Sequence, residues 1–246
     1  MMRTRKLESI VDAVGCTPLV RLRGLERETP GVEIFLKLEY CNPGGSVKDR
    51  PALNMLRAAQ SAGQLQSGKA IIDATSGNTG VAYSLYGAAL GQKVILVMPE
   101  NVTQARKDIT QAFGTELIFS DPMEGSDGAI RLCRQIVQER PDDYVYLDQY
   151  ANPHNPQAHY LGTGREILAQ VGDRLTHFVA GLGTSGTMMG TTRRLRQHSR
   201  PIRCIAVQPA EALHGLEGLK HMQSSIVPPI YDAALPDEQR TVGTED

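Results

Sequence analysis

The sequence lacks an excess of charge of either sign, and it lacks any long hydrophobic run. Its 246 residues contain 26 lysines and arginines against 27 aspartates and glutamates, which gives a formal net charge of -1. A net charge near zero argues against a protein whose main role is to bind nucleic acid or an acidic membrane surface. The longest apolar runs, such as Val94–Met98, are far too short to cross a bilayer. We therefore expect a soluble protein with neither nucleic acid nor membrane among its partners.

Cysteine is also scarce, and the four that occur, without any CxxC pair, are Cys16, Cys41, Cys133 and Cys204. In a chain of this size such spacing is typical of free thiols in a reducing cytoplasm. His154 and His159 have Pro156 between them, which is not a metal-ligand pattern. The N-terminal stretch MMRTRKLESI is basic but carries no apolar run, so it makes a poor secretory signal. We expect a cytoplasmic location and no bound metal.

Short β-branched runs alternate along the chain with amphipathic stretches, and this alternation predicts an α/β fold. Strands separated by single helices cannot form hairpins, so we expect parallel pairing with helices on both faces of the sheet. The continuous apolar run Thr176–Ala180 is expected to be a central strand. The expected strands are 33–39, 70–74, 93–98, 116–120, 144–147, 176–180 and 202–207. The expected helices are 49–62, 79–90, 103–113, 125–139, 157–170 and 187–197.

Two polar, proline-containing segments predict a division of the chain into two lobes. The first is Asp148–Pro156, which lies between two periodic regions, and the second is Tyr40–Gly45. Two such crossings would leave residues 40–147 as one lobe. Residues 1–39 and 148–246 would then form the other.

A first glycine-rich cluster, Asn42–Arg50, contains Lys48 at the expected start of a helix. Pro51 cannot lie deep inside a helix, so the helix should begin near Asp49, whose carboxylate suits the N-cap region. The positive end of the helix dipole would favour the neutral, nucleophilic form of Lys48. The alternative is a solvated surface lysine after a turn.

A second cluster, Thr75–Gly80, directly follows an expected strand and precedes an expected helix. Such a junction points unpaired backbone amides above the carboxyl edge of the sheet. Three hydroxyl groups and a carboxamide within six residues suit a small carboxylate ligand. A merely well-capped turn is the alternative.

A third cluster, Gly181–Thr187, contains the dinucleotide-binding pattern GxGxxG. That fingerprint also requires an acidic residue at the end of the next strand, where this chain has Val207, Gln208 and Pro209. The loop is therefore suited to a phosphate and not to an NAD ribose. Its hydroxyl groups favour a phosphomonoester. Together, a lysine, a carboxylate loop and a phosphate loop meet the needs of one cofactor, pyridoxal phosphate.

The chain resembles the O-acetylserine sulfhydrylases (cysteine synthases) of the B type, within the fold-type-II family of pyridoxal-phosphate enzymes, whose fold is like the tryptophan synthase β subunit. The resemblance covers essentially the whole chain, in the order and spacing of the family. The motifs that carry it are Gly15–Val20, Asn42–Arg50, Thr75–Gly80, Asp148–Pro153 and Gly183–Thr187.

The resemblance assigns roles to matching positions. Lys48 resembles the lysine that binds the cofactor covalently and removes the substrate Cα proton, and Asn78 resembles the residue that contacts the 3′-oxygen of the cofactor. The residues that resemble the substrate-carboxylate site are Thr75, Ser76, Thr79 and Gln149. Those that resemble the phosphate loop are Gly183, Thr184, Ser185, Gly186 and Thr187.

The reaction that this resemblance implies is β-replacement. Acetate leaves O-acetyl-L-serine, an enzyme-bound aminoacrylate forms, and a sulfur donor adds to give L-cysteine. Family members are usually homodimers whose smaller lobe closes over the substrate, which fits the lobe expected at 40–147. Serine acetyltransferase or a sulfur-carrier protein would be a further partner.

The chain departs from the family pattern at two places. Family members usually carry asparagine where Cys16 stands. The stretch Thr241–Asp246 resembles a segment after which the family continues for several tens of residues, including a serine that faces the pyridine nitrogen of the cofactor. We therefore expect the sequence to represent part of a longer protein.

Three other functions fit parts of the pattern. The chain could be an O-phosphoserine sulfhydrylase, in which Lys220 pairs with the substrate phosphate. It could be similar to cystathionine β-synthase, although nothing marks a homocysteine site. It could also be a non-catalytic partner protein that binds pyridoxal phosphate without turnover.

Overall fold

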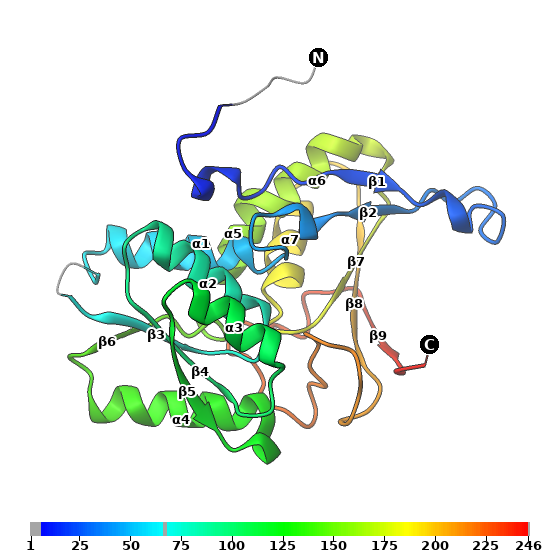
Figure 1. Ribbon diagram of the computed structural model, residues 1–246. Helices are drawn as coiled ribbons and strands as arrows, with labels where there is room; N and C mark the ends of the chain where they lie inside the picture. Colours follow the sequence, from blue (N-terminus) through cyan, green and yellow to red (C-terminus); the bar gives the residue numbers. More distant parts are fainter. Residues whose placement is uncertain (1–5, 66–67, 246) are drawn as a thin grey trace.

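The computed structural model describes residues 6–65 and 68–245, and it contains two parallel sheets and one short antiparallel pair (Figure 1). Residues 1–5, on which the secretory-signal argument partly rests, and Asp246 lie outside the described residues. The strands are β1 Leu19–Arg21, β2 Phe35–Lys37, β3 Ala70–Ala74, β4 Val94–Pro99, β5 Glu116–Ser120, β6 Tyr144–Tyr146, β7 His177–Gly181, β8 Arg203–Pro209 and β9 Glu238–Val242. The helices are α1 Asp49–Ser61, α2 Asn78–Ala89, α3 Gln104–Ala112, α4 Gly125–Glu139, α5 His154–Ala158, α6 Gly164–Val171 and α7 Gly186–Leu195.

The first parallel sheet has the strand order β5-β4-β3-β6, with helices on both faces. Successive side chains of β4 point to opposite faces because the side-chain period of a strand is two. Leu96 therefore packs in the cluster that contains α1 and α2, whereas Val97 packs in the cluster that contains α4. Figure 1 shows α4 on one side of this sheet and α1, α2 and α3 on the other. The predicted α/β class with parallel sheets is confirmed.

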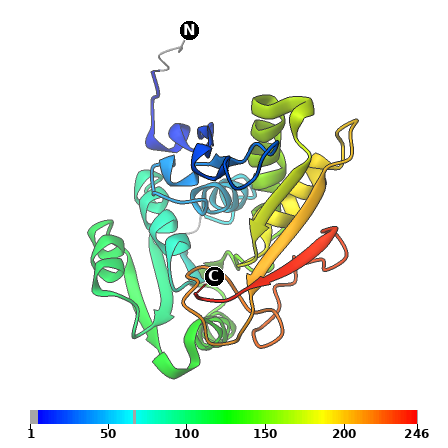
Figure 2. The same cartoon turned by 90° about the vertical axis from the view of Figure 1, so that its right-hand side faces the viewer.

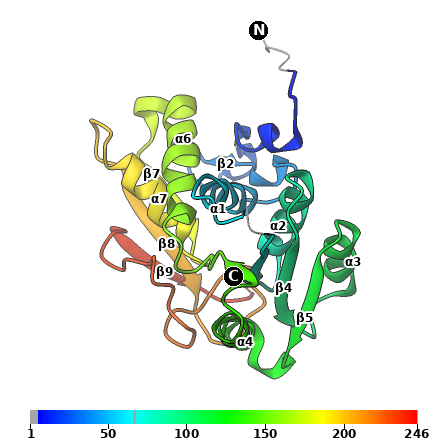
Figure 3. The same cartoon turned by 90° about the vertical axis from the view of Figure 1, so that its left-hand side faces the viewer.

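The second parallel sheet has the order β7-β8-β9. Met188, Met189 and Leu195 of α7 pack against it together with Leu168 of α6. Figure 3 shows α6 and α7 beside this sheet. The prediction that Thr176–Ala180 is a central strand is wrong for the described residues, where β7 pairs with β8 alone. Its side chains alternate between partly buried and exposed. An apolar run does not reveal its neighbours, and the polar sequence of β9 gave no strand signal.

The expectation of parallel pairing throughout is also wrong at the N-terminal end of the chain. The strand expected at 33–39 shortens to β2, which pairs antiparallel with β1, and Val20 lies opposite Leu36. The connection between them contains only the 3₁₀ turn Arg23–Leu25, so no helical crossover imposes parallel pairing. Figure 2 shows this pair at the same end of the molecule as α6.

The single helix expected at 157–170 is interrupted by a π-helical turn, His159–Thr163, between α5 and α6. At this point α5 approaches α7 closely, since a Cβ on Gly190 would collide with the carbonyl oxygen of Pro156. The extra residue of a π turn rotates the side chains on either side of it, and such turns are frequent at functional sites. The π turn therefore orients the His159 side chain toward Thr187 at the start of α7.

Cysteines and candidate metal ligands do not cluster in the part of the chain that the structure describes. All four cysteines are free thiols, with Cys133 and Cys204 buried. Among the described residues, no group of three or more histidine, cysteine or acidic side chains is placed to hold a metal ion. Within the same residues, every helix is too short or too polar to span a lipid bilayer.

Candidate active site

Lys48 immediately precedes α1, which begins at Asp49 as predicted. The Asp49 carboxylate does not cap the helix, however. It turns back into the preceding loop and accepts hydrogen bonds from the backbone amides of Gly44 (2.6 Å) and Ser46 (3.1 Å), and it also accepts the Tyr86 hydroxyl. These contacts fix the loop that leads into Lys48. Burial lowers the pKa of the Lys48 amine, which favours the neutral form that a nucleophile or base requires.

His159 contacts the first turn of α7 from the π-helical turn. Its Nε2 atom lies 3.3 Å from the Thr187 hydroxyl, and its Nδ1 atom lies 2.9 Å from the Thr163 hydroxyl. Burial, together with the positive charges of Arg50 and Lys48, lowers the pKa of the imidazole to about 3. The sequence analysis examined His159 only as a metal ligand and rejected that role. Its link to Thr187 depends on the π turn, which the sequence pattern did not predict.

We expect the His159 imidazole to stay neutral in the folded protein between about pH 5 and 8. Its ordinary pKa is 6.5, so below that pH the unfolded chain binds a proton that the folded chain does not. The free energy of unfolding should therefore fall as the pH falls below about 6.5. The imidazole ¹⁵N chemical shifts of His159 measure this directly, and the urea-unfolded chain is the control. A folded-state titration near pH 6.5 would contradict the buried, neutral assignment.

The residues proposed for the substrate carboxylate are brought together by the fold, although Gln149 is 70 residues from Thr79. The Thr79 hydroxyl donates to Gln149 Oε1 at 2.7 Å, and Gln149 Nε2 donates to the Ala74 carbonyl at 2.7 Å. The Thr75 hydroxyl accepts from the amides of Gly77 and Gly80 and so shapes the turn. A ligand carboxylate would have to compete with the bond between Thr79 and Gln149.

Asn78 and Ser76 are the more accessible members of this loop. The Asn78 side chain is exposed at the start of α2 and has no hydrogen-bond partner among the described residues. Ser76 is half-buried, and its hydroxyl accepts from the hydroxyl of Ser126 at 3.1 Å. Asn78 is therefore free to bind a ligand group above the end of the sheet.

A buried aspartate, Asp73, binds Gln149 and so stabilises the substrate-carboxylate site. The sequence analysis did not identify it. Asp73 accepts hydrogen bonds from the Tyr83 hydroxyl (2.8 Å) and from the backbone amide of Gln149 (3.1 Å). Burial raises the pKa of its carboxyl group to about 7. The signal was present in the sequence, because Asp73 is the one charged residue in the otherwise apolar strand β3. It ties the position of Gln149 to the sheet.

The third glycine-rich cluster forms the junction between β7 and α7. Ser185 has a left-handed backbone (φ 71°) directly before the first residue of α7. Its hydroxyl is buried and has no hydrogen-bond partner among the described residues. An unpartnered buried hydroxyl at a helix N-terminus is a ready donor to an anion. Gly183 lets the backbone approach the Gly218 carbonyl, with which a Cβ would collide.

Asn155 joins the phosphate-type loop to the carboxylate-type loop, and sequence reasoning missed it. Its side-chain amide donates to the Thr184 hydroxyl at 3.0 Å and to the backbone carbonyl of Gln149 at 2.7 Å. Gly186 has no Cβ, and one would overlap the Asn155 side chain. A continuous series of hydrogen bonds therefore runs from Thr79 through Gln149 and Asn155 to Thr184.

The ammonium group of Lys220 is already paired with a carboxylate of the protein. Its ammonium group donates to Asp127 at 2.6 Å and lies 5.4 Å from the centre of the Tyr150 ring. Asp127 also accepts the backbone amide of Ile226 at 2.8 Å. Lys220 thus binds the N-terminal turn of α4 to the segment that follows β8.

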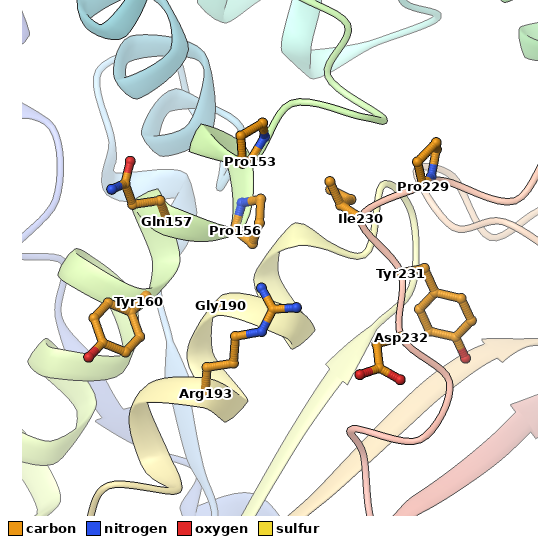
Figure 4. A pocket seen from close by; sticks show the side chains of 10 residues that line it. All are labelled: Pro153, Pro156, Gln157, Tyr160, Gly190, Arg193, Pro229, Ile230, Tyr231 and Asp232. Carbon is orange, nitrogen blue, oxygen red and sulfur yellow. The ribbon is translucent and has the colours of Figure 1, made fainter.

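A cavity of about 410 Å³ lies beside this site but is lined by other residues (Figure 4). Figure 4 shows Gly190 and Arg193 of α7 together with Pro156 and Tyr160 on one side of it, and Tyr231 on the other side. None of the residues predicted for cofactor or substrate lines this cavity. The candidate site is therefore formed by the three glycine-rich loops and not by this cavity.

Comparison with known proteins gives consistent matches. The family described as "Pyridoxal-phosphate dependent enzyme" matches residues 10–240. The chain is 55% identical over 241 residues to a cysteine synthase of Aquifex aeolicus, covering 97% of this chain and 74% of that relative. It is 43% identical over 234 residues to cysteine synthase B of Pseudomonas aeruginosa, covering 95% of this chain and 77% of that relative. The crystal structure of cysteine synthase from Entamoeba histolytica superposes with a TM-score of 0.93 at 35% identity, covering 100% of this chain and 75% of that one.

Proposed function

The chain belongs to the pyridoxal-phosphate-dependent enzyme family, and from this premise we propose that it makes L-cysteine from O-acetyl-L-serine and a sulfur donor. The observation that carries the proposal is the joining of two anion-binding loops by Gln149 and Asn155. One loop suits the carboxylate of an amino acid and the other suits a phosphomonoester. Burial lowers the pKa of the Lys48 amine. The charge of Lys48 acts on the imidazole of His159, which contacts the phosphate-type loop at Thr187.

The residues present fit pyridoxal phosphate. The buried hydroxyl of Ser185 has no hydrogen-bond partner in the described part of the chain, and α7 begins directly after it, so this loop can receive a phosphate. We propose that Lys48, Asn78 and Gly183–Thr187 hold the cofactor. When bound, the cofactor withdraws electrons from the substrate Cα and so makes its proton acidic.

The side chains of the protein then orient the substrate and move its proton. We propose that Thr75, Ser76, Thr79 and Gln149 bind the carboxylate, which requires the bond between Thr79 and Gln149 to open. With the carboxylate held, the Cα–H bond would be presented to the Lys48 amine, which would be free to take the proton as general base once the substrate amino group has replaced it in the bond to the cofactor. Loss of acetate, addition of a sulfur nucleophile at Cβ and return of the proton from Lys48 to Cα would give L-cysteine. The net reaction with sulfide converts O-acetyl-L-serine into L-cysteine and acetate.

The ion pair of Lys220 with Asp127 favours the acetyl ester over O-phosphoserine as substrate. A phosphate at this position would have to displace Asp127 from a contact of 2.6 Å. The formation of L-cysteine from each ester with sulfide, measured by product analysis, tests the proposed function. We expect turnover with O-acetyl-L-serine, and turnover with O-phosphoserine alone would contradict the substrate assignment.

We also propose a two-lobed, homodimeric arrangement in the cytoplasm. The sheet β5-β4-β3-β6 falls within residues 40–147, the smaller closing lobe, and β7-β8-β9 falls within the larger cofactor lobe of residues 1–39 and 148–246. Val20 and Leu36 lie opposite each other on the β1–β2 pair and are each 45% exposed, which offers apolar surface to a second copy. Free thiols suit a reducing compartment. Serine acetyltransferase or a sulfur-carrier protein is proposed as a further partner.

Ser185→Ala is expected to weaken pyridoxal phosphate binding about tenfold, because it removes a buried hydroxyl that would donate to a charged phosphate. Equilibrium titration by fluorescence measures the dissociation constant. Pyridoxal, which has the same ring but no phosphate, is the matched control ligand, and its affinity should be unchanged. An equal loss for both ligands would show that the substitution disturbs the site generally and would contradict the assignment of this loop.

A further inference from the structure

Arg106, in the first turn of α3, contacts the substrate-carboxylate loop from outside the site. Its Nη1 atom donates to the Ser76 carbonyl at 2.7 Å, and its Nη2 atom donates to Glu217 Oε2 at 2.6 Å. The side chain is only 30% exposed, whereas Glu217 is 75% exposed. The two ends of one planar guanidinium group therefore bind two segments that are far apart in the sequence.

The loop is shaped to receive this guanidinium group. A Cβ on Gly77 would lie 3.2 Å from Arg106 Nη1, so the absence of a side chain there leaves room for the contact. The Ser76 side chain is held from another direction by the Ser126 hydroxyl. Ser76 is thus fixed through both its carbonyl and its hydroxyl, one residue before Gly77 and three before Thr79.

The other end of Arg106 reaches a segment that lies directly on the phosphate-type loop. Glu217 is followed by Gly218, whose carbonyl oxygen packs against Gly183. Two residues later, the Lys220 amide donates to the Leu182 carbonyl at 2.7 Å. Arg106 therefore connects the backbone of the carboxylate loop to the segment that supports the phosphate loop.

We propose that Arg106 is a positioning residue that holds the Ser76–Thr79 turn in the geometry that binds the substrate carboxylate. The role rests on the proposed function of that loop. Arg106 does not touch the substrate. It acts through the Ser76 carbonyl, and Glu217 orients its guanidinium group. The contact with Ser76 carries most of the effect, because an exposed ion pair such as that with Glu217 contributes little.

The test is the affinity of the pyridoxal-phosphate-loaded protein for L-serine, an amino acid that has the substrate carboxylate but no good leaving group. Binding is followed by the change in visible absorption. Arg106→Gln is expected to raise the L-serine dissociation constant about tenfold. It should raise KM for O-acetyl-L-serine to a similar extent, with kcat changed less. The dissociation constant of pyridoxal phosphate should be unchanged.

Lys107→Gln is the matched control, since it removes a positive charge from the next residue of the same helix. Lys107 donates to the Glu100 carbonyl at 2.7 Å and lies over the Phe119 ring, so it has no contact with the loop. Its L-serine affinity should equal that of the wild type. Arg106→Lys keeps the charge but offers a single ammonium group to two partners, so it should give an intermediate affinity. Glu217→Gln should change the affinity by about twofold or less.

Three outcomes separate this proposal from the proposed function. A wild-type protein that fails to bind pyridoxal phosphate or L-serine contradicts both. A wild type that binds both, with unchanged L-serine affinity in Arg106→Gln, contradicts the positioning role alone. An equal loss of pyridoxal phosphate and L-serine affinity in Arg106→Gln and Arg106→Lys also contradicts it, since that pattern indicates a general disturbance of the fold.

Discussion

Lys48→Ala is expected to reduce the rate of L-cysteine formation at least about a thousandfold, because one side chain supplies both the covalent attachment of the cofactor and the base for the Cα proton. Lys48 precedes a helix on a loop fixed by Asp49, and burial lowers the pKa of its amine. The variant should also lose the visible absorption band of the lysine-bound cofactor. Steady-state kinetics and the absorption spectrum measure the two effects on the same sample.

The control for this substitution is Lys93→Ala, at a lysine that lies 3.0 Å from Glu116 and is 62% exposed. Its activity and spectrum should match those of the wild type. Lys48→Arg should be as inactive as Lys48→Ala, since the arginine side chain stays a cation and cannot act as an amine nucleophile at neutral pH. Activity in Lys48→Ala within tenfold of the wild type would exclude Lys48 as the catalytic amine.

Arg50→Met is expected to lower the free energy of unfolding by about 3 kcal/mol or more, because it leaves two carboxylates with fewer cationic partners inside the protein. The Arg50 side chain is 4% exposed and makes ion pairs of 2.6 Å with Glu39 and Glu166. Lys37 remains as a partner of Glu166 at 2.6 Å, which limits the loss. Urea unfolding followed by circular dichroism measures the difference.

Arg57→Gln is the matched control on the same helix. Arg57 is 51% exposed and lies 3.8 Å from Asp12, so its loss should change the free energy of unfolding by no more than about 0.5 kcal/mol. An effect of Arg50→Met as small as that of Arg57→Gln would contradict the structural role of the buried ion cluster.

Acid should diminish the difference between the wild type and Arg50→Met. The hydrogen bonds from Arg50 and Lys37 lower the pKa of Glu166 from its ordinary 4.5 to about 2. The stability that this carboxylate contributes is present above about pH 4.5 and is lost as the pH falls through 2. The two unfolding curves should therefore converge on acidification over that range.

The parts of the site that could be predicted from the sequence are those fixed by local chain geometry. Gly44 marks a place where the side chain of Asp49, five residues further along the chain, approaches too closely for a Cβ. The strand–turn–helix junctions at β3–α2 and β7–α7 follow from the switch between two local periodicities. These signals depend on neighbours in the sequence, so they were readable without a structure.

The residues that the sequence did not reveal act across long separations. Asn155 contacts Thr184 over 29 residues, and Asp73 contacts the Gln149 amide over 76. Asp73 stands out as the charged residue of an apolar strand, but the sequence does not indicate which residue it contacts. Nothing in the local pattern of Asn155 distinguishes its contact from an ordinary polar position. The central placement expected for β7 failed for the same reason, because an apolar run does not specify which strands lie beside it.

The measurement that tests the central claim most directly is the visible absorption spectrum of the purified chain after incubation with pyridoxal phosphate, before and after addition of O-acetyl-L-serine. We predict a band from lysine-bound cofactor that changes on addition of O-acetyl-L-serine in the wild type and is absent in Lys48→Ala. A band that forms equally in Lys48→Ala, or no band in the wild type at saturating cofactor, would contradict the account.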